Sequence, residues 1–234
     1  MTYFGTDVDP RDVPAYGIAE AAHYLRLNQA TLRTWVVGRG YFAKGEQQYW
    51  KPVIELPDPK LRALSFMNLI EAHVLSSIRR QHKVSFPAVR SALHYVREHH
   101  RSKHPLADRE FETDGKDLFI EELGRTINAS SKGQQVLREI MGRFLKRIER
   151  DTMGLAVRLF PYTRPSESED TRLVVIDALV SFGRPVVAGT GIRTSVILDR
   201  FLAGDAPEQL AEDYGRSRAE IDEAIRWEKL QNAA

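Results

Sequence analysis

The stretch IAEAAHYL at residues 18–25, followed by ATLRTW at residues 30–35, decides the predicted fold of the first half of the chain. Small and apolar side chains recur in the first stretch at three- and four-residue spacing, which predicts a short helix. Asn28 can cap a second helix that runs to Val37, where Gly38 would end it. Two short helices joined by a tight turn are the outline of a helix-turn-helix.

A hairpin is predicted directly after the second helix. Its turn lies at Lys44–Gly45, and short strands are expected at Tyr41–Phe42, Tyr49–Trp50 and residues 53–56. A hairpin in this position has the shape of the wing of a winged helix-turn-helix.

Two longer helices complete this predicted domain. Ser65 begins one and Ser85 begins the other, and each helix carries apolar side chains along one face. We therefore predict a winged helix-turn-helix domain over residues 15–105, preceded by a loose arm at residues 1–14.

The middle of the chain, residues 106–165, is predicted to be a connector made of a hairpin and a helix. Asp114–Gly115 is the dipeptide that two-residue hairpin turns favour, so residues 109–121 are expected to form the hairpin. The helix should begin at Ser130 or Ser131, because apolar side chains then recur at helical spacing.

A second domain, residues 170–234, is predicted after a linker at residues 161–171 that is rich in proline, serine and acids. A strand at residues 173–176 and a glycine-rich loop or hairpin at residues 182–192 should precede a helix that begins at Thr194. Two further helix starts lie on either side of a glycine turn; they are the capping boxes Asp205 with Glu208 and Ser217 with Glu220, around Gly215. The result is a second helix-turn-helix outline in a chain that is predicted to be mainly α.

Charge is distributed unevenly along the chain, although the net charge is only +2. Residues 1–105 carry 15 Lys and Arg against 9 Asp and Glu, whereas residues 166–234 carry 8 against 13. A basic surface can lie against DNA phosphates and an acidic one is repelled, so a nucleic-acid-binding face is expected in the first half only.

Several protein classes are excluded by composition. The chain has no cysteine, which excludes disulfides, thiolate metal sites and cysteine nucleophiles. It shows neither a signal peptide nor the run of about 18 apolar residues that a membrane span needs, so we expect a cytoplasmic protein with no membrane attachment.

Residues 16–98 resemble the DNA-binding domain of the MerR family. The resemblance rests on the stretch at residues 18–35 and on VSFPAVR at residues 84–90, which is similar to that family's second helical pair. It implies that the second helix enters the major groove and that the wing holds the flanking backbone. The residues expected to contact DNA are Gln29, Thr31 and Arg33 in the groove, and Arg39 and Lys44 on phosphates.

The alternative is that Thr31 and Arg33 are merely exposed residues of a packed helical pair that binds no DNA. Leu32 and Trp35 are expected to lie in the core rather than to contact a ligand.

The sequence gives little support for a catalytic, metal-binding or nucleotide-binding site. His100 and His104 have the i, i+4 spacing of a helical metal site, but Pro105 follows at once, so we favour a solvated helix end where a charged histidine suits the helix dipole. Residues 189–191, Gly-Thr-Gly, lack the following lysine of a phosphate loop, and no nucleophile motif is present. No catalytic residue, metal or cofactor is therefore predicted.

Residues 173–228 resemble a small bacterial domain family that commonly lies beside toxins with a PIN nuclease fold and is regarded as an antitoxin. The resemblance rests on VIDALVSFGRPVVAGTGIR at residues 175–193, AGD at residues 203–205 and LAEDYG at residues 210–215. Joined to the N-terminal resemblance, it makes the whole chain similar to a two-domain VapB-type antitoxin. This implies a protein that neutralises a VapC-type PIN-domain ribonuclease and represses its own operon by binding operator DNA.

The chain departs from common VapB proteins, which are short, with a β-sheet DNA-binding dimer and a disordered tail. The manner of toxin inhibition is therefore not carried over. Arg193 and Arg226 are predicted toxin contacts, because an arginine can enter a carboxylate pocket, although a structural salt bridge explains either residue equally well. A homodimer is expected, since repressors of this geometry usually read two half-sites, and the connector and second domain are the expected dimer surface.

Two other functions stay open from the sequence. The first is a MerR-like, ligand-responsive transcriptional regulator with no toxin partner, which co-purification with a nuclease would distinguish. The second is an enzyme, which ranks far lower because no catalytic constellation is visible.

Overall fold

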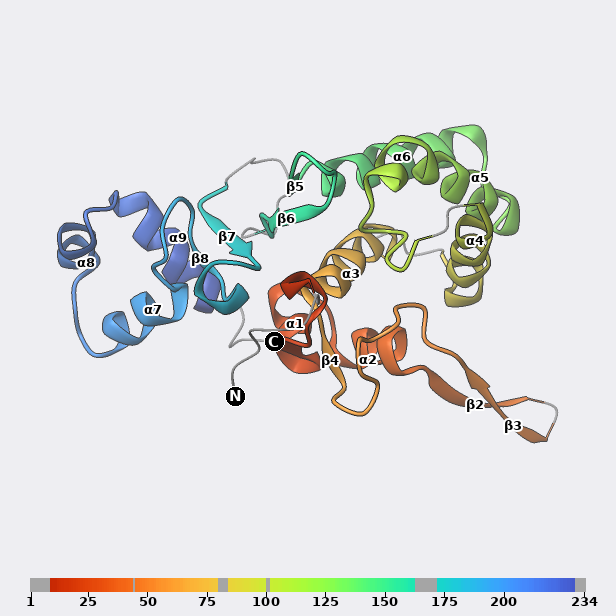
Figure 1. Cartoon of the computed structure of the whole chain (residues 1–234), viewed down its shortest axis with the longest axis horizontal. Coiled ribbons are helices and arrows are strands. Elements are labelled where there is room, and N and C mark those ends of the chain that lie inside the picture. The colour runs from red at the N-terminus through yellow and green to blue at the C-terminus, as the bar shows by residue number, and fades with distance from the viewer. Residues whose placement is uncertain (1–8, 44, 80–83, 100–101, 163–171, 230–234) are drawn as a thin grey trace. The chain divides into compact units, whose positions relative to one another are not determined.

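The computed structural model describes residues 9–43, 45–79, 84–99, 102–162 and 172–229. The chain forms two compact units, Met1–Ala156 and Val157–Ala234 (Figure 1). The predicted mainly α fold with an N-terminal helix-turn-helix is confirmed. Most of the predicted linker at residues 161–171 lies outside the described residues.

The first unit is built from helices with short strands between them. Its helices are α1 (Ile18–Tyr24), α2 (Gln29–Val37), α3 (Phe66–Arg79), α4 (Phe86–His99), α5 (Lys116–Thr126) and α6 (Ser131–Leu145). Its strands are β1 (Tyr16–Gly17), β2 (Arg39–Ala43), β3 (Glu46–Trp50), β4 (Ala63–Leu64) and β5 (Ile148–Arg150).

Local capping signals predicted the helix starts well. Asn28 accepts a hydrogen bond from the amide of Ala30 at the start of α2, and Ser130 accepts one from the amide of Gly133 at the start of α6. Ser65 and Asn68 exchange side-chain hydrogen bonds with each other's backbone amides at the start of α3. Each cap satisfies an amide that has no partner inside its helix.

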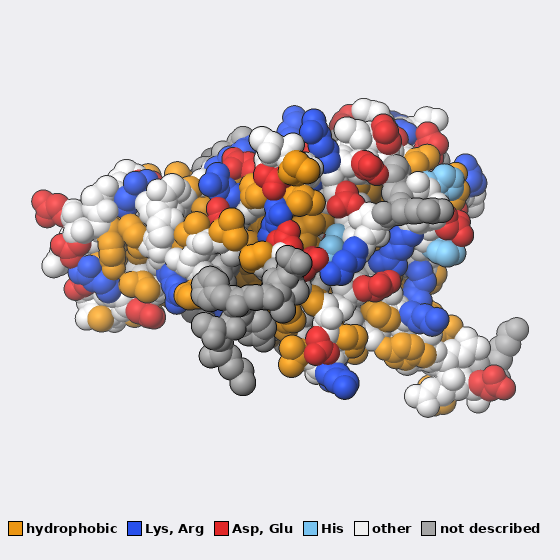
Figure 2. All heavy atoms as spheres, in the orientation of Figure 1, with side chains coloured by type: hydrophobic (Ala, Val, Ile, Leu, Met, Phe, Trp, Pro, Cys, Tyr) orange, Lys and Arg blue, Asp and Glu red, His pale blue; other side chains and the backbone are white. Residues whose placement is uncertain are grey.

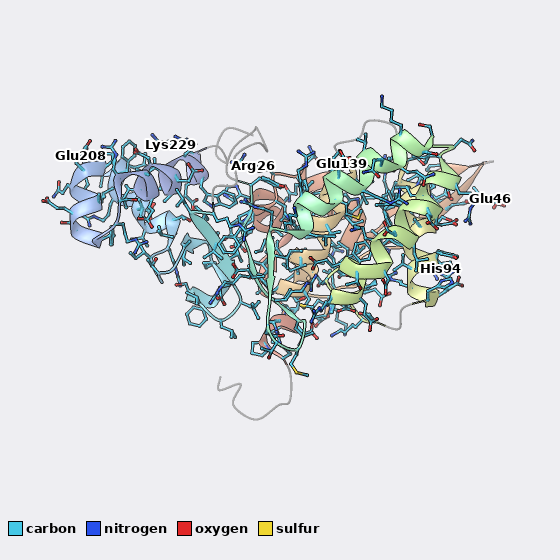
Figure 3. All side chains as sticks on the ribbon, turned by 90° about the horizontal axis from the view of Figure 1, so that it is seen from above. Arg26, Glu46, His94, Glu139, Glu208 and Lys229 are labelled. Atoms are coloured by element: carbon cyan, nitrogen blue, oxygen red, sulfur yellow. The ribbon has the colours of Figure 1, made fainter. Side chains whose placement is uncertain are left out.

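The predicted wing is present as the antiparallel hairpin β2–β3, which projects from α2 (Figure 1), and Glu46 lies towards its far end (Figure 3). The strand predicted at residues 53–56 is wrong. Val53 and Ile54 instead form a buried loop whose amides both donate to the carbonyl of Trp35, at 2.8 and 3.1 Å. Their apolar character reflects burial against the end of α2, not pairing in a sheet.

The hairpin predicted at residues 109–121 is also wrong. Phe111–Gly115 forms a π-helical turn (η2) that continues into α5, and Gly115 has ordinary right-handed helical angles. Phe111, Phe119 and Leu123 recur at helical spacing and are almost fully buried. The burial of this apolar face outweighs the turn preference of a single Asp-Gly pair.

Helix α3 lies at the centre of the first unit. Every residue from Phe66 to Ile78 is buried, and α6 and the short 3-10 helix η1 (Pro10–Asp12) contact it. The ring of His73 packs 5.0 Å from the ring of Phe144, and its Nε2 lies 3.1 Å from the Phe144 carbonyl oxygen. A helix buried on all sides must satisfy its polar side chains internally.

One such polar side chain, Glu71, is satisfied by a buried ion pair that the sequence did not predict. His104 was expected at a solvated helix end, but it is 5% exposed, and its Nδ1 lies 3.1 Å from Oε2 of Glu71 on α3. Its Nε2 lies 2.9 Å from Oδ1 of Asp12, an ion-pair contact rather than an aligned hydrogen bond. Asn68 donates to the same Glu71 oxygen at 3.1 Å. His100, the other half of the proposed pair, lies outside the described residues.

This cluster makes stability depend on pH. Burial raises the pKa of Glu71, against the opposing effects of His104, Asn68 and Arg97. Burial alone would lower the pKa of His104, but the hydrogen bond and charge of Glu71 and the charge of Asp12 outweigh burial and the repulsion from Lys103, so the pKa is raised. Both shifts mean that the folded chain holds a proton more tightly than the unfolded chain does.

We therefore expect the free energy of unfolding to fall as pH rises. The contribution of His104 is fully present below its ordinary pKa of 6.5 and is lost as pH rises through the raised folded value. Urea unfolding at pH 6 and pH 9 should show a difference on the order of 1 kcal/mol. In His104→Gln that difference should shrink. A pH dependence of the same size in the variant would place its origin elsewhere.

The second unit combines a small sheet with a three-helix layer. Strands β6 (Ala156–Leu159), β7 (Val174–Asp177) and β8 (Val186–Val187) pair antiparallel in that order. The strand predicted at residues 173–176 is present as β7, but its pairing with β8 was not predicted. The helices are α7 (Thr194–Leu202), α8 (Pro207–Tyr214) and α9 (Arg218–Lys229), with the 3-10 turn η3 (Ser181–Gly183) before β8. The core they share is formed by Val187, Ile197, Leu198, Leu210, Ile221, Ala224 and Ile225.

Of the two capping boxes predicted in this unit, one is confirmed. Ser217 and Glu220 exchange hydrogen bonds at the start of α9, and Gly215 ends α8 in a left-handed conformation. The box at Asp205 is wrong, because α8 begins after Ala206 without a side-chain cap. The carboxylate of Asp205 instead accepts from Nε of Arg200 at 2.6 Å. A charged donor binds a carboxylate more strongly than a backbone amide does.

Candidate nucleic-acid interface

Helix α2 presents a polar outer face, as a groove-reading helix requires. Leu32 and Trp35 are buried, at 0% and 4% exposure, which confirms their predicted place in the core. Gln29 and Arg33 are exposed and lie one turn apart, so their side chains share a face of the helix. Thr31 is half-buried at the edge of that face.

The predicted cations of this surface are available to a ligand. The guanidinium groups of Arg33 and Arg39 are exposed, and neither makes a hydrogen bond or ion pair with the part of the chain that the structure describes. Arg39 begins β2, opposite Trp50. Lys44, the remaining predicted contact, lies outside the described residues.

Further cations, which the sequence pattern did not indicate, lie beside the wing. Arg90 and Arg97 of α4 donate to the carbonyl groups of Lys51 and Val53, in the loop that follows β3. Lys and Arg side chains accordingly gather between α4 and the base of the hairpin (Figure 2). Lys51 is exposed. In the sequence, only the charge of Arg90 and Arg97 pointed to a DNA contact, because their position beside the wing depends on how α4 packs.

The wing also exposes aromatic side chains. Phe42 is 80% exposed and Tyr49 is 58% exposed. The sequence pattern placed both in strands but did not indicate which face would be free. The face became evident only from the packing of the opposite side, where the ring of Tyr41 lies 4.5 Å from that of Trp50.

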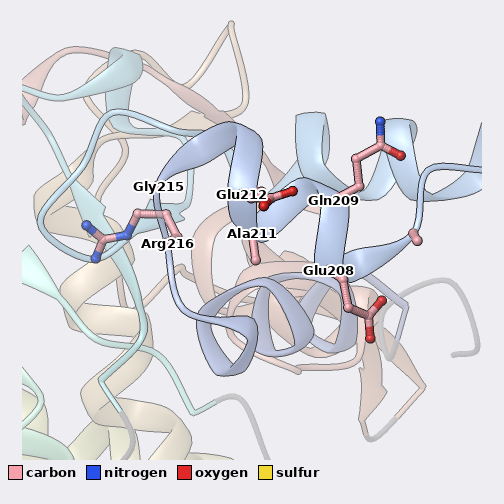
Figure 4. Close-up of a pocket in the computed structure, with 7 residues that line it drawn as sticks. Glu208, Gln209, Ala211, Glu212, Gly215 and Arg216 are labelled. Atoms are coloured by element: carbon pink, nitrogen blue, oxygen red, sulfur yellow. The ribbon is translucent and has the colours of Figure 1, made fainter.

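The second unit carries a different surface. A shallow groove of about 750 Å³ runs along α8, lined by Ala206, Glu208, Gln209, Ala211, Glu212, Gly215 and Arg216 (Figure 4). Glu208 and Glu212 are exposed, and Glu208 pairs with Arg218. If this helix-turn-helix bound DNA, α8 would bring carboxylates towards the phosphates.

The two predicted toxin contacts differ in their surroundings. Arg193 precedes the first residue of α7 and makes no side-chain bond to the residues that the structure describes. Arg226, in the last turn of α9, forms an ion pair of 2.7 Å with the buried Glu223. The guanidinium of Arg193 is thus the more available of the two.

The loop between β7 and β8 presents two large apolar side chains to solvent. Leu179 is 72% exposed and Phe182 is 85% exposed. Ser181 and Phe182 both adopt left-handed backbone angles, with φ of 49° and 57°. Ser181 Oγ donates to the Gly191 carbonyl at 2.9 Å, which ties the loop to its neighbour. Strained, exposed residues held in this way are found at binding sites.

No three His, Asp or Glu side chains within the described ranges are grouped as a metal site would need. Among the same residues, no helix is long and apolar enough to cross a membrane.

Two family models match the chain, one in each of its two units. Residues 14–93 match the family described as "Putative DNA-binding HTH domain". Residues 174–227 match the family described as "Protein of unknown function (DUF433)".

Comparisons with individual proteins match nearly the whole chain. The chain is 30% identical to the "Putative antitoxin VapB45" of Mycobacterium tuberculosis (strain ATCC 25618 / H37Rv), over 92% of this chain and 93% of that protein. It is 24% identical to the "Uncharacterized protein Rv2308" of the same strain, over 95% of this chain and 93% of that protein. The crystal structure of Rv2018 from M. tuberculosis superposes with a TM-score of 0.66 at 25% identity, covering 92% of this chain and 98% of that one.

Proposed function

The chain belongs to the family of the putative antitoxin VapB45, and from that premise we propose that it is the antitoxin of a type II toxin-antitoxin system. It binds and neutralises a PIN-domain, VapC-type ribonuclease and represses its own operon by binding operator DNA. The observation that supports this most strongly is the pairing of a DNA-binding helix-turn-helix with a VapB-named relative over nearly the full length. It acts by binding and not by catalysis.

In this proposal the first unit binds the operator. Gln29, Thr31 and Arg33 of α2 read bases in the major groove, while Arg39 and Lys44 of the wing hold phosphates. The exposed positions of Gln29, Arg33 and Arg39 and the absence of competing carboxylate partners among the described residues support this assignment. A homodimer would place two such units on two half-sites of the operator, in the cytoplasm where bacterial DNA lies.

The second unit binds the toxin. A protein that cleaves RNA needs a basic surface, and the exposed carboxylate of Glu212 on α8 complements such a surface, whereas Glu208 already pairs with Arg218. The Leu179 and Phe182 side chains supply the apolar anchor that protein interfaces need, since aromatic residues dominate their binding energy. Arg193 is the preferred partner for carboxylates of the nuclease, ahead of Arg226, which already pairs with Glu223.

Phe182→Ala should weaken the complex with the ribonuclease about tenfold or more, because a central aromatic anchor is lost. The measurement is co-expression of the full chain with the PIN-domain protein encoded beside its gene, followed by co-purification and titration of RNA cleavage. Arg193→Glu should weaken inhibition in the same assay.

Phe42→Ala removes a similarly exposed phenylalanine from the first unit. It is the matched control and should inhibit the nuclease like the wild type. If neither Phe182→Ala nor Arg193→Glu changed inhibition, the toxin would bind elsewhere. If no nuclease co-purified with the wild type, a ligand-responsive regulator would be the better account.

A further inference from the structure

The two faces of the wing differ sharply. In the β2–β3 register, Gly40 lies opposite Tyr49 and Phe42 opposite Gln47, so that Phe42, Gln47 and Tyr49 share one face. The other face carries Tyr41 and Trp50, and the Trp50 ring packs 6.0 Å from that of Phe86 on α4. One face is therefore anchored to the body of the unit, and the other is left bare.

The bare face is fixed relative to α2. The Tyr49 hydroxyl donates to the carbonyl of Val37, the last residue of α2. The loop after β3 is tied to the same helix by the amides of Val53 and Ile54, which both donate to Trp35. The Phe42 face thus continues from the end of the helix that is proposed to enter the major groove.

The bare face is too small for a stable contact between two copies of the chain. An aromatic side chain buries about 150–250 Å², so Phe42 and Tyr49 together bury roughly 300–500 Å², below the roughly 800 Å² per partner of a specific protein interface. Arg39 lies on the opposite face with Trp50, so the choice of DNA as the neighbour rests on the small area of the bare face and on its continuity with the end of α2. Duplex DNA offers a matching apolar surface, since deoxyribose rings line the walls of its minor groove between the phosphates.

We propose that the wing makes an apolar contact with DNA, in which Phe42, supported by Tyr49, packs against the deoxyribose walls of the minor groove beside the groove that α2 enters. The proposal rests on the DNA-binding part of the proposed function and adds to it a residue that touches sugars instead of phosphates. The effect of salt distinguishes this contact from a phosphate contact, because an apolar contact releases no counterions and leaves the salt dependence of binding unchanged.

The test uses the full-length chain and a duplex that the wild type selects from a random-sequence pool. Phe42→Ala should lower affinity about tenfold at every salt concentration, with the slope of log K against log salt unchanged. Arg39→Ala should instead reduce that slope by about one, as the loss of one phosphate contact does. Thermal unfolding of Phe42→Ala should match the wild type, because the side chain is 80% exposed.

Leu202→Ala is the control, since it removes an exposed apolar side chain from the second unit that has no proposed role in binding, and it should bind the duplex like the wild type. Unchanged affinity in Phe42→Ala, a changed salt slope in that variant, or an equal loss in Leu202→Ala would each overturn the proposal. A change in sedimentation instead of DNA affinity would assign the face to contact between copies. If the wild type selected no duplex, the DNA-binding function would fail, and this inference with it.

Discussion

Gly38→Ala is expected to abolish specific DNA binding and to destabilise the first unit by about 2–5 kcal/mol. Gly38 has φ of 86° and ψ of −175°, a conformation that is essentially restricted to glycine. A Cβ there would lie 2.3 Å from the backbone oxygen of Trp50. To relieve this contact the hairpin must move away from α2, so the wing could no longer bind beside the helix that is proposed to read the groove.

The measurements are the thermal unfolding temperature and affinity for the selected duplex. Gly40→Ala is the matched control: it lies two residues further along, and its added Cβ makes only ordinary contacts, at 3.6 Å with the amide nitrogen of the Gln47 side chain and at 3.9 Å with the Gln48 carbonyl oxygen. We expect it to bind nearly like the wild type. If Gly38→Ala folded and bound as the wild type does, the connection between α2 and the wing would have no part in recognition.

Arg33→Ala should lower affinity for the selected duplex roughly tenfold to a hundredfold and relax preference at one base position. The reason is that a guanidinium paired to a guanine contributes about 1–3 kcal/mol of discrimination. Competition binding with single-base variants of the duplex, at fixed salt, measures both effects.

Arg125→Ala provides the control, because Arg125 is an exposed arginine of α5 whose side chain pairs with Glu122. It should leave base preference unchanged. A uniform loss across all duplexes in Arg33→Ala would make Arg33 a phosphate contact, and no loss would remove α2 from the major groove.

Much of the helical framework could be predicted from the sequence because its signals are local. A cap such as Asn28 or Ser217 acts on amides within three residues, so the structure around it hardly depends on the rest of the chain. The outward face of α2 followed from helical spacing in the same way. The exposure of Arg33 therefore agrees with the sequence, whereas its contact with DNA stays a prediction.

The errors arose where a distant residue decides the outcome. Asp205 has the right spacing for a cap, but Arg200 takes its carboxylate. His104 lies near charged, polar neighbours in the sequence, yet it is buried against Glu71, 33 residues away. Phe42 could not be singled out because the free face of the wing depends on the packing of Trp50 against Phe86. Single-sequence patterns contain no information on such pairings.

The burial of α3 on all sides also has a consequence while the chain is being synthesised. On the ribosome, α1, α2 and the wing leave the exit tunnel long before α6, yet α3 needs α6 to cover it, and His73 lies against Phe144. Until Phe144 has emerged, one side of an apolar helix stays open to water. The nascent chain therefore exposes the segment of α2, the helix proposed to read DNA, before its core can be completed, and during that interval its apolar surface is open to misassembly unless a chaperone shields it.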